Sequence, residues 1–186
     1  MLLTLTGGAG AGKTTLANEL AATASTAPVQ VLHGDDYYYS TQDRGVWACD
    51  DTGVLRLDVG DPQSMDVERL SYDTTVALAV SAVVIVEGLF ARHVSPQAPC
   101  ARFDVFVDLP ADLRLVRKIQ RKCVRDGFPL EVLLRNYLNH RRDAHERHIE
   151  PVRHHCELVV DGARDSGTLA HQVWSAIADQ KLIHSS

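Results

Sequence analysis

The sequence lacks several features that mark whole classes of protein. Its 186 residues include only four cysteines with no CxxC pair, so we expect neither a disulfide framework nor a zinc site. Acidic residues outnumber lysine and arginine by 24 to 19, which disfavours a general nucleic-acid or membrane surface. No apolar run approaches the ~20 residues that span a bilayer. We therefore expect a cytoplasmic chain without nucleic-acid or membrane partners.

The composition is otherwise that of one ordinary globular domain. Apolar residues make up 45% of the chain and charged residues 23%, which argues against disorder. The length suits a single domain with a sizeable core, so we predict one domain over residues 1–186. The sequence leaves the oligomeric state open.

Short apolar runs alternate with helical patterns along the chain. We predict strands at Leu2–Thr6, Val29–His33, Ala82–Val86, Phe103–Leu109 and Leu158–Val160. Helices are predicted at Thr14–Ala24, from an N-cap at Ser64 to Val80, from Pro110 onward, at Pro129–His148 and at Thr168–Leu182, with residues 34–62 mostly loop. This alternation predicts an α/β fold with a mostly parallel, five-stranded sheet and helices on both faces.

A glycine-rich loop follows the first predicted strand. Residues 7–15 fit the pattern GxxxxGKS/T, in which glycines let backbone N–H groups point inward at phosphate oxygens. Lys13 can reach the outer phosphates, and the Thr14 hydroxyl can bind Mg²⁺. We therefore predict a nucleotide-phosphate site formed by Gly8, Ala9, Gly10, Ala11, Gly12, Lys13, Thr14 and Thr15.

Two acidic residues are expected at the carboxyl edge of the predicted sheet. Asp35 follows the second strand, and Glu87 ends the strand that begins at Ala82. Ligands of open α/β folds bind at that edge, where Asp35 can orient an attacking hydroxyl and accept its proton. Glu87 can bind Mg²⁺ together with Thr14. The alternatives are that Asp35 caps a turn, that Asp36 is the base instead, and that Glu87 only accepts backbone hydrogen bonds.

A run of basic residues lies in the helix predicted after Pro110. We predict a lid over about residues 112–128, with cations three or four positions apart at Arg114, Arg117, Lys118, Arg121 and Arg125. Such a lid can stabilise charge on a transferred phosphoryl group, although a solvated helix face is the usual meaning of a charge run. We expect Arg117 and Arg121 to contact the nucleotide, with Arg121 as the catalytic cation.

Several segments together resemble the uridine kinase and phosphoribulokinase superfamily of P-loop kinases, which includes nicotinamide riboside kinases. Beside the glycine-rich loop, the similar segments are Asp35–Tyr38, Val83–Gly88, Phe106–Asp108, Arg114–Arg121 and His148–Pro151. Each segment alone is weak, but their shared order and spacing make the resemblance specific. The half after residue 103 looks more like uridine kinases, whereas Asp51–Met65 is more similar to nicotinamide riboside kinases.

The resemblance implies a P-loop NTPase fold and an ATP- and Mg²⁺-dependent kinase that phosphorylates a hydroxyl of a nucleoside or similar ribosyl compound. It implies catalytic roles for Lys13, Asp35 and Arg121. It also implies that Asp58, or alternatively Asp61, binds two sugar hydroxyls, and that Tyr38, Lys118 and Asn136 contact the acceptor. A non-nucleoside alcohol such as pantothenate or a sugar stays open as the acceptor, and so does a non-catalytic ATP-binding regulator.

The chain also departs from the family pattern. Uridine kinases carry an aromatic hairpin that holds the base, after the helix that follows Asp66, whereas the residues between Glu68 and Ala82 suffice here only for a helix. A sugar-phosphate acceptor would need basic residues near Asp58, and the sequence offers Arg44 and Arg56 for that purpose.

Overall fold

A five-stranded sheet forms the centre of the protein. The computed structural model describes residues 1–25, 28–50 and 53–183. The strands are β1 (Leu2–Thr6), β2 (Val29–His33), β5 (Val83–Gly88), β6 (Arg102–Asp108) and β7 (Leu158–Asp161). They lie in the order β2-β5-β1-β6-β7, and every neighbouring pair is parallel. The predicted α/β fold with a five-stranded sheet is confirmed.

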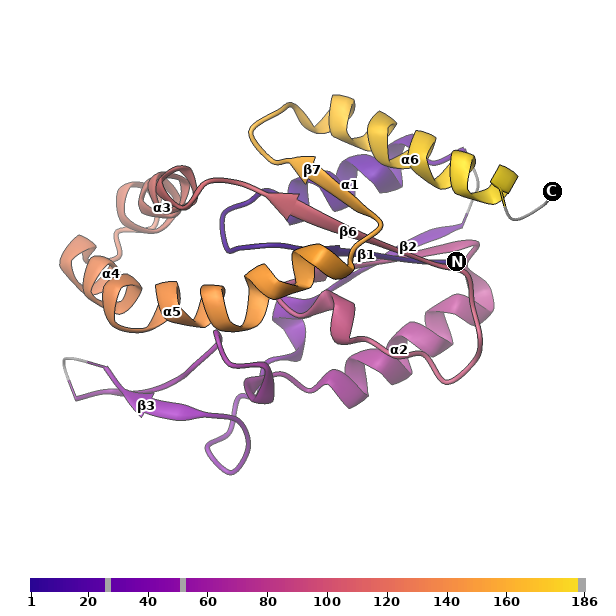
Figure 1. Ribbon diagram of the computed structural model, residues 1–186. Coiled ribbons are helices and arrows are strands. Elements are labelled where there is room, and N and C mark those ends of the chain that lie inside the picture. The colour runs from indigo at the N-terminus through magenta and orange to yellow at the C-terminus, as the bar shows by residue number, and fades with distance from the viewer. Residues whose placement is uncertain (26–27, 51–52, 184–186) are drawn as a thin grey trace.

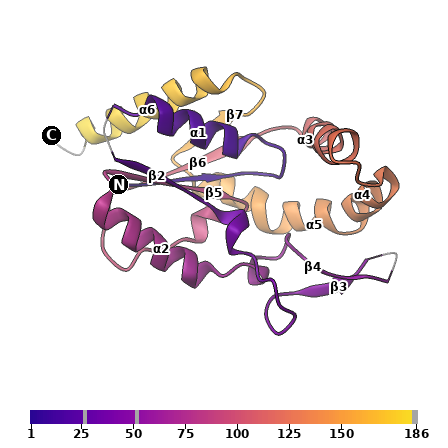
Figure 2. The ribbon, with the colours of Figure 1, turned by 180° about the vertical axis from the view of Figure 1, so that it is seen from behind.

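Helices cover both faces of the sheet (Figures 1 and 2). On one face α1 (Lys13–Thr23) packs beside α6 (Ser166–Ile183). On the other face lie α2 (Val67–Val80) and the short turn Ala91–His93. None of the helices in the described part of the chain has the length and apolar character that a membrane crossing requires.

The sheet divides the core into two layers. Successive strand side chains point to opposite faces, so Leu3 and Ile85 pack toward α1 and α6, whereas Leu2 and Val84 pack toward α2. Both layers are buried, which explains why β5 reads as an unbroken apolar run before Glu87. The arrangement brings the carboxyl ends of the strands, with their polar residues, to one edge.

The described part of residues 34–62 is mostly loop, as predicted, but it also contains two short strands that the sequence did not reveal. β3 (Trp47–Cys49) and β4 (Leu55–Leu57) form an antiparallel hairpin that stands apart from the main sheet (Figure 1). Each strand has only three residues and exposes most of its side chains, so no alternating pattern marks it in the sequence. Asp51 and Thr52, which begin the stretch similar to nicotinamide riboside kinases, lie outside the described residues.

The predicted N-cap at Ser64 is also wrong. Asp66 caps α2, since its side chain accepts a hydrogen bond from the Arg69 backbone N–H at 3.0 Å. Ser64 ends a short 3₁₀ turn that begins at Pro62, and its buried hydroxyl oxygen accepts from the backbone N–H of Val46 at 3.1 Å. The serine therefore ties the chain near the hairpin to the start of α2 instead of capping the helix.

The helices between Pro110 and the last strand are less regular than predicted. α3 (Ala111–Ile119) continues as a π-helix over Gln120–Arg125. The predicted single helix Pro129–His148 is α4 (Leu130–Asn136) and α5 (Arg142–Ala144), with π-helical stretches at Tyr137–Arg141 and His145–Ile149. Its predicted apolar face packs only in part, because Leu133 is buried whereas Leu138 is 64% exposed.

Candidate active site

A cavity of about 670 Å³ opens at the carboxyl edge of the sheet. It is lined by the glycine-rich loop, by the turn that follows β2, by the end of β5, by α3 with its π-helical extension, and by the start of α6. The predicted site residues among its lining are Ala9–Thr15, Asp35, Tyr38, Glu87, Arg117, Lys118 and Arg121. Residues from distant parts of the sequence therefore meet around one space.

The glycine-rich loop wraps around one side of this cavity. Gly10 and Gly12 have φ angles of 88° and 102°, which favour glycine. Lys13 is buried, and its Nζ donates a hydrogen bond to the Gly8 carbonyl oxygen at 3.1 Å. Burial lowers the pKa of the Lys13 ammonium, while the negative charges of Glu87 and Asp35 act to raise it. The ammonium thus stands within electrostatic reach of both predicted carboxylates.

Glu87 is the buried carboxylate of the site, and it contacts Thr14. Its Oε1 accepts a hydrogen bond from Thr14 Oγ1 at 3.0 Å and lies 2.9 Å from His33 Nδ1, which donates when that nitrogen is protonated. Hydroxyl and carboxylate oxygens are the hard ligands that Mg²⁺ prefers. The donor set formed by Thr14 and Glu87 therefore fits the predicted ion.

Only one of the two rival aspartates lines the cavity. Asp35 is part of the lining, together with Tyr38, whose hydroxyl donates to the Val59 carbonyl oxygen at 3.0 Å. Burial raises the pKa of Tyr38 and the charge of Asp35 raises it further, so the two groups are near each other. Asp36 is not among the described lining residues. The alternative in which Asp36 is the base therefore loses geometric support, and the catalytic role of Asp35 stays a prediction.

The basic helix presents part of its charge to the cavity. Arg117 Nη1 donates to the carbonyl oxygens of Gly162 at 3.0 Å and Gly10 at 3.4 Å, which ties α3 to the glycine-rich loop. Lys118 and Arg121 also line the cavity. Lys122 and Arg125 instead form ion pairs with Asp126. The predicted lid thus has a side that faces the cavity and a side on which two cations share the carboxylate of Asp126.

Two residues predicted to bind the acceptor substrate are not among the described residues that line the cavity. Asp58 Oδ1 accepts from the Gly60 backbone N–H at 2.9 Å and from Arg141 Nη1 at 2.5 Å. Asn136 lies on α4 and is not among the described residues that line the cavity. The alternative to Asp58, Asp61, caps the 3₁₀ turn through a hydrogen bond from Gln63. Their contacts with an acceptor stay predictions.

Sequence reasoning missed three polar side chains at the site. His33 is the last residue of β2 and contacts Glu87, and its place at a strand end could have revealed it. Arg164 and Ser166 follow β7 and line the cavity from the far end of the chain. Both come after the carboxyl end of a strand, which is the same signal that identified Asp35.

Comparisons with known proteins identify the family of the chain. The sequence model of the Phosphoribulokinase / Uridine kinase family matches residues 59–168. The chain belongs to this family. It is 27% identical to a uridine kinase of Staphylococcus epidermidis over 179 residues, which cover 86% of this chain and 86% of that enzyme. A uridine kinase of Staphylococcus aureus is 26% identical over the same length.

Solved structures of other kinases share the fold of this family member. A sugar kinase from a Janibacter species aligns with a TM-score of 0.62 at 16% identity, covering 95% of this chain and 94% of its own. A possible uridine kinase from Bacillus stearothermophilus aligns with a TM-score of 0.53 at 18% identity, covering 87% and 88%. These likenesses show the fold alone.

Family membership makes the chain a small-molecule kinase, a phosphotransferase with a nucleotide-binding P-loop. A kinase of this family implies ATP together with a divalent metal ion. The glycine-rich loop with Lys13 and the oxygen ligands of Thr14 and Glu87 suit those two requirements.

Proposed function

We propose that this kinase transfers the γ-phosphoryl group of ATP to a hydroxyl of a nucleoside or a similar ribosyl compound. The observation that carries the proposal is that Asp35 lines the same cavity as Lys13, Thr14 and Glu87. A nucleotide-dependent regulator would need the phosphate-binding residues but no acceptor base. Uridine is the first acceptor to test, because both curated relatives named above are uridine kinases.

The phosphate end of the nucleotide is held by the loop before α1. Backbone N–H groups of Gly10–Thr15 and the N-terminal end of α1 attract the phosphate oxygens, and Lys13 adds a buried positive charge. Thr14 and Glu87 would hold Mg²⁺, which would neutralise charge on the phosphates when bound. Glu87 is pre-oriented for this by its contacts with Thr14 and His33.

Asp35 acts on the acceptor in this proposal. Its carboxylate aligns the attacking hydroxyl in line with the transferred group and accepts the proton late in the reaction. Arg121 then places positive charge over the transferred phosphoryl group. Closure of this side of α3 also excludes water, which limits hydrolysis of ATP without an acceptor.

The test is ATP consumption by the purified protein with Mg²⁺ against uridine, cytidine, nicotinamide riboside, pantothenate and simple sugars, with the product identified by mass spectrometry. Asp35→Asn should lower kcat on the accepted substrate by roughly 10²–10⁴-fold. Calorimetric ATP affinity should stay within a few-fold. Asp36→Asn is the matched control, and it should retain nearly all activity because Asp36 is not among the described lining residues.

The outcomes separate the competing functions. Turnover on a ribosyl compound that is lost only in Asp35→Asn would support the proposal. Turnover on pantothenate or a sugar alone would keep the kinase and reject the nucleoside acceptor. Tight ATP binding with no acceptor phosphorylated, and no effect of Asp35→Asn, would favour the regulator.

A further inference from the structure

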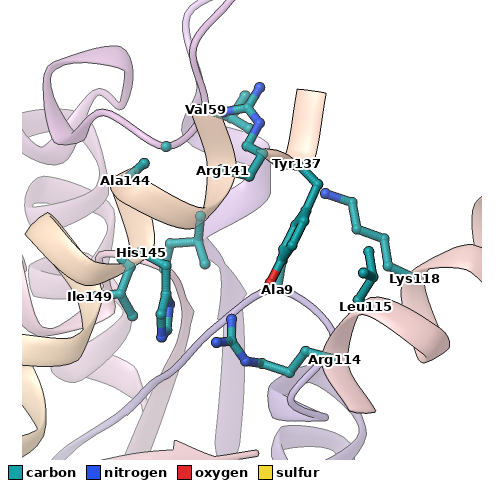
Figure 3. A pocket seen from close by; sticks show the side chains of 12 residues that line it. Ala9, Val59, Arg114, Leu115, Lys118, Tyr137, Arg141, Ala144, His145 and Ile149 are labelled. Atoms are coloured by element: carbon teal, nitrogen blue, oxygen red, sulfur yellow. The ribbon is translucent and has the colours of Figure 1, made fainter. Parts of the chain in front are cut away.

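A second, smaller pocket of about 80 Å³ adjoins the nucleotide cavity (Figure 3). We call it the lid pocket, since it lies between α3, the chain at Val59 and the helical segment 137–149. It shares Ala9, Val59, Leu89 and Lys118 with the nucleotide cavity. A ligand that reaches Asp35 in the larger space can therefore extend into the lid pocket.

Most of the lid pocket is lined by carbon. Leu115 from α3 and Ala144 and Ile149 from the opposite segment form much of its wall. The ring of Tyr137 stands in the middle of the view in Figure 3. Apolar walls of this kind with an aromatic ring favour a flat, apolar group, and the small volume limits that group to about the size of one ring.

The lid pocket is lined by four basic side chains. Arg114, Lys118, Arg141 and His145 contribute to the lining, and no Asp or Glu is among its described lining residues. In Figure 3 the side chains of Arg114 and Lys118 extend from α3 toward Tyr137. An apolar pocket with cations at its margin suits a ligand that combines a ring with negative charge.

Two of these basic groups already have acidic partners, and two do not. Arg141 pairs with Asp58, and His145 Nε2 lies 3.3 Å from Glu150 Oε2. Among the described residues, no carboxylate lies within ion-pair distance of Lys118 or Arg114. Burial lowers the pKa of the Lys118 ammonium, and the charges of Arg141 and Arg121 lower it further. A half-buried cation without a counter-ion is costly, so an anion at Lys118 would be stabilising.

The lid pocket has basic side chains beyond those that line the nucleotide cavity. Lys13, Arg117, Arg121 and Arg164 line the nucleotide cavity alone and can serve its phosphates, whereas Lys118 lines both spaces. Arg114 and Arg141 line the lid pocket and are not among the described residues of the nucleotide cavity. The positive charge at the lid pocket therefore points to the acceptor.

Resting on the proposed kinase function, we propose that the lid pocket binds a flat apolar group of the acceptor that carries a carboxylate, held by Lys118 and Arg141. A carboxylate matches the single unpaired ammonium of Lys118. Phosphate groups are typically held by several backbone N–H groups at a helix N-terminus, which the glycine-rich loop supplies in the other cavity. The structure also provides a basic residue at Asp58, namely Arg141, that sequence reasoning had not found.

The first arm of the test compares two acceptors that differ only in charge. These are 5-carboxyuridine and 5-carbamoyluridine, each with MgATP. We expect kcat/KM to favour the carboxylate about tenfold or more, as charge-assisted hydrogen bonds usually allow. Lys118→Met and Arg141→Met should each bring the ratio close to one, and Lys118→Arg should keep the preference. Lys122→Met is the matched control, because Lys122 lies on the same lid, pairs with Asp126 and should leave the ratio unchanged.

The second arm needs no turnover. Benzoate and benzamide, matched in shape, are titrated at millimolar concentration while the thermal unfolding midpoint is measured. We expect benzoate to raise the midpoint and benzamide to have little effect, with the benzoate shift lost in Lys118→Met and kept in Lys122→Met.

The outcomes separate this inference from the proposed function. Equal kcat/KM for the two uridine derivatives, with no benzoate shift, would overturn the carboxylate site while leaving the kinase intact. If no nucleoside is phosphorylated although ATP binds, the proposed function fails. The Lys118-dependent benzoate shift would then still decide whether the lid pocket binds a carboxylate.

Discussion

The Glu87 carboxylate is held in place by residues that lie far from it in the sequence. Glu87 Oε1 contacts both Thr14, at the start of α1, and His33, at the end of β2. The side chain of Glu87 is 6% exposed, whereas that of His33 is 39% exposed. A buried carboxylate needs such partners to keep one orientation, and residues behind a metal ligand commonly tune the affinity for the metal.

Removing the imidazole at position 33 should therefore weaken the use of Mg²⁺. We expect His33→Ala to raise the Mg²⁺ concentration for half-maximal activity by about 10-fold or more, since Glu87 loses one partner. His33→Asn keeps a short N–H donor and should recover most of the effect. Binding of Mn²⁺ in the presence of ADP, followed by EPR, gives a readout that needs no turnover. Equal Mn²⁺ affinity in wild type and His33→Ala would refute this role.

Cys156 should be an unreactive thiol near neutral pH. Burial raises the pKa of its Sγ–H from 9.0 to about 11, and Asp104 adds to the shift. The thiolate is the reactive form, so alkylation by iodoacetamide should be slow at pH 8 and rise about tenfold per pH unit toward pH 11. Since the folded pKa is raised, the neutral thiol favours the folded state below pH 9, and this contribution is lost as the pH rises through 11. Site-resolved mass spectrometry measures the rate. Fast alkylation of Cys156 at pH 8 would contradict the raised pKa of this thiol.

At the scale of elements, the glycine-rich loop depends on a close approach by α3. A Cβ atom at Gly10 would lie 2.8 Å from the Arg114 carbonyl oxygen, and the φ angle there is already positive. Arg117 reinforces the approach by donating to the Gly10 and Gly162 carbonyl oxygens. The loop that cradles phosphates is therefore shaped by the helix that carries the lid cations.

Gly10→Ala should consequently damage nucleotide binding. Backbone strain at such a position costs about 1–3 kcal/mol, and the contact with Arg114 adds to it. We expect calorimetric ATP affinity to fall about tenfold or more while circular dichroism shows a folded protein. Gly53→Ala is the control, because Gly53 has a φ of +79° with nothing within 4 Å of the added Cβ. It should cost about 1 kcal/mol of stability and leave ATP affinity unchanged. An ATP affinity that Gly10→Ala leaves at the wild-type value would count against the close approach.

At the scale of the whole molecule, the central sheet holds the site together. β5 lies between β2 and β1, so Ile85 is paired with Leu3 on one side and Val31 on the other. Ile85 is fully buried in the layer beneath α1 and α6. The strand that positions Glu87 is therefore also a strand through the middle of the core.

Shortening the side chain of Ile85 should destabilise the folded protein strongly. Ile85→Ala should lower the free energy of unfolding by about 2–5 kcal/mol, whereas Ile85→Val should cost about 0.5–1.5 kcal/mol. Val76→Ala, at a 52% exposed position on α2, should stay within about 0.5 kcal/mol. Chemical denaturation measures all three, and a small cost for Ile85→Ala would show that the layer repacks.

Much of the framework was accessible from the sequence because it depends on local signals. The unbroken apolar strands predicted a parallel sheet, and the spacing of glycines before Lys13 predicted the phosphate loop. Because both residues follow or end a predicted parallel strand, the sequence also predicted that Asp35 and Glu87 lie at the edge of the sheet where ligands bind. The three-residue strands of the β3–β4 hairpin carry too short a pattern for such signals.

The tertiary structure alone decided how side chains share the space at that edge. Asp35 and Asp36 are adjacent and chemically identical, and only the course of the chain after β2 directs Asp35 to the cavity. Asp58 meets Arg141 across 83 positions of sequence, and Lys118 is left without a carboxylate in the described part of the chain. Local pattern determines which elements form, but the balance of charge in a pocket depends on groups that only the packing of those elements brings within a few ångströms.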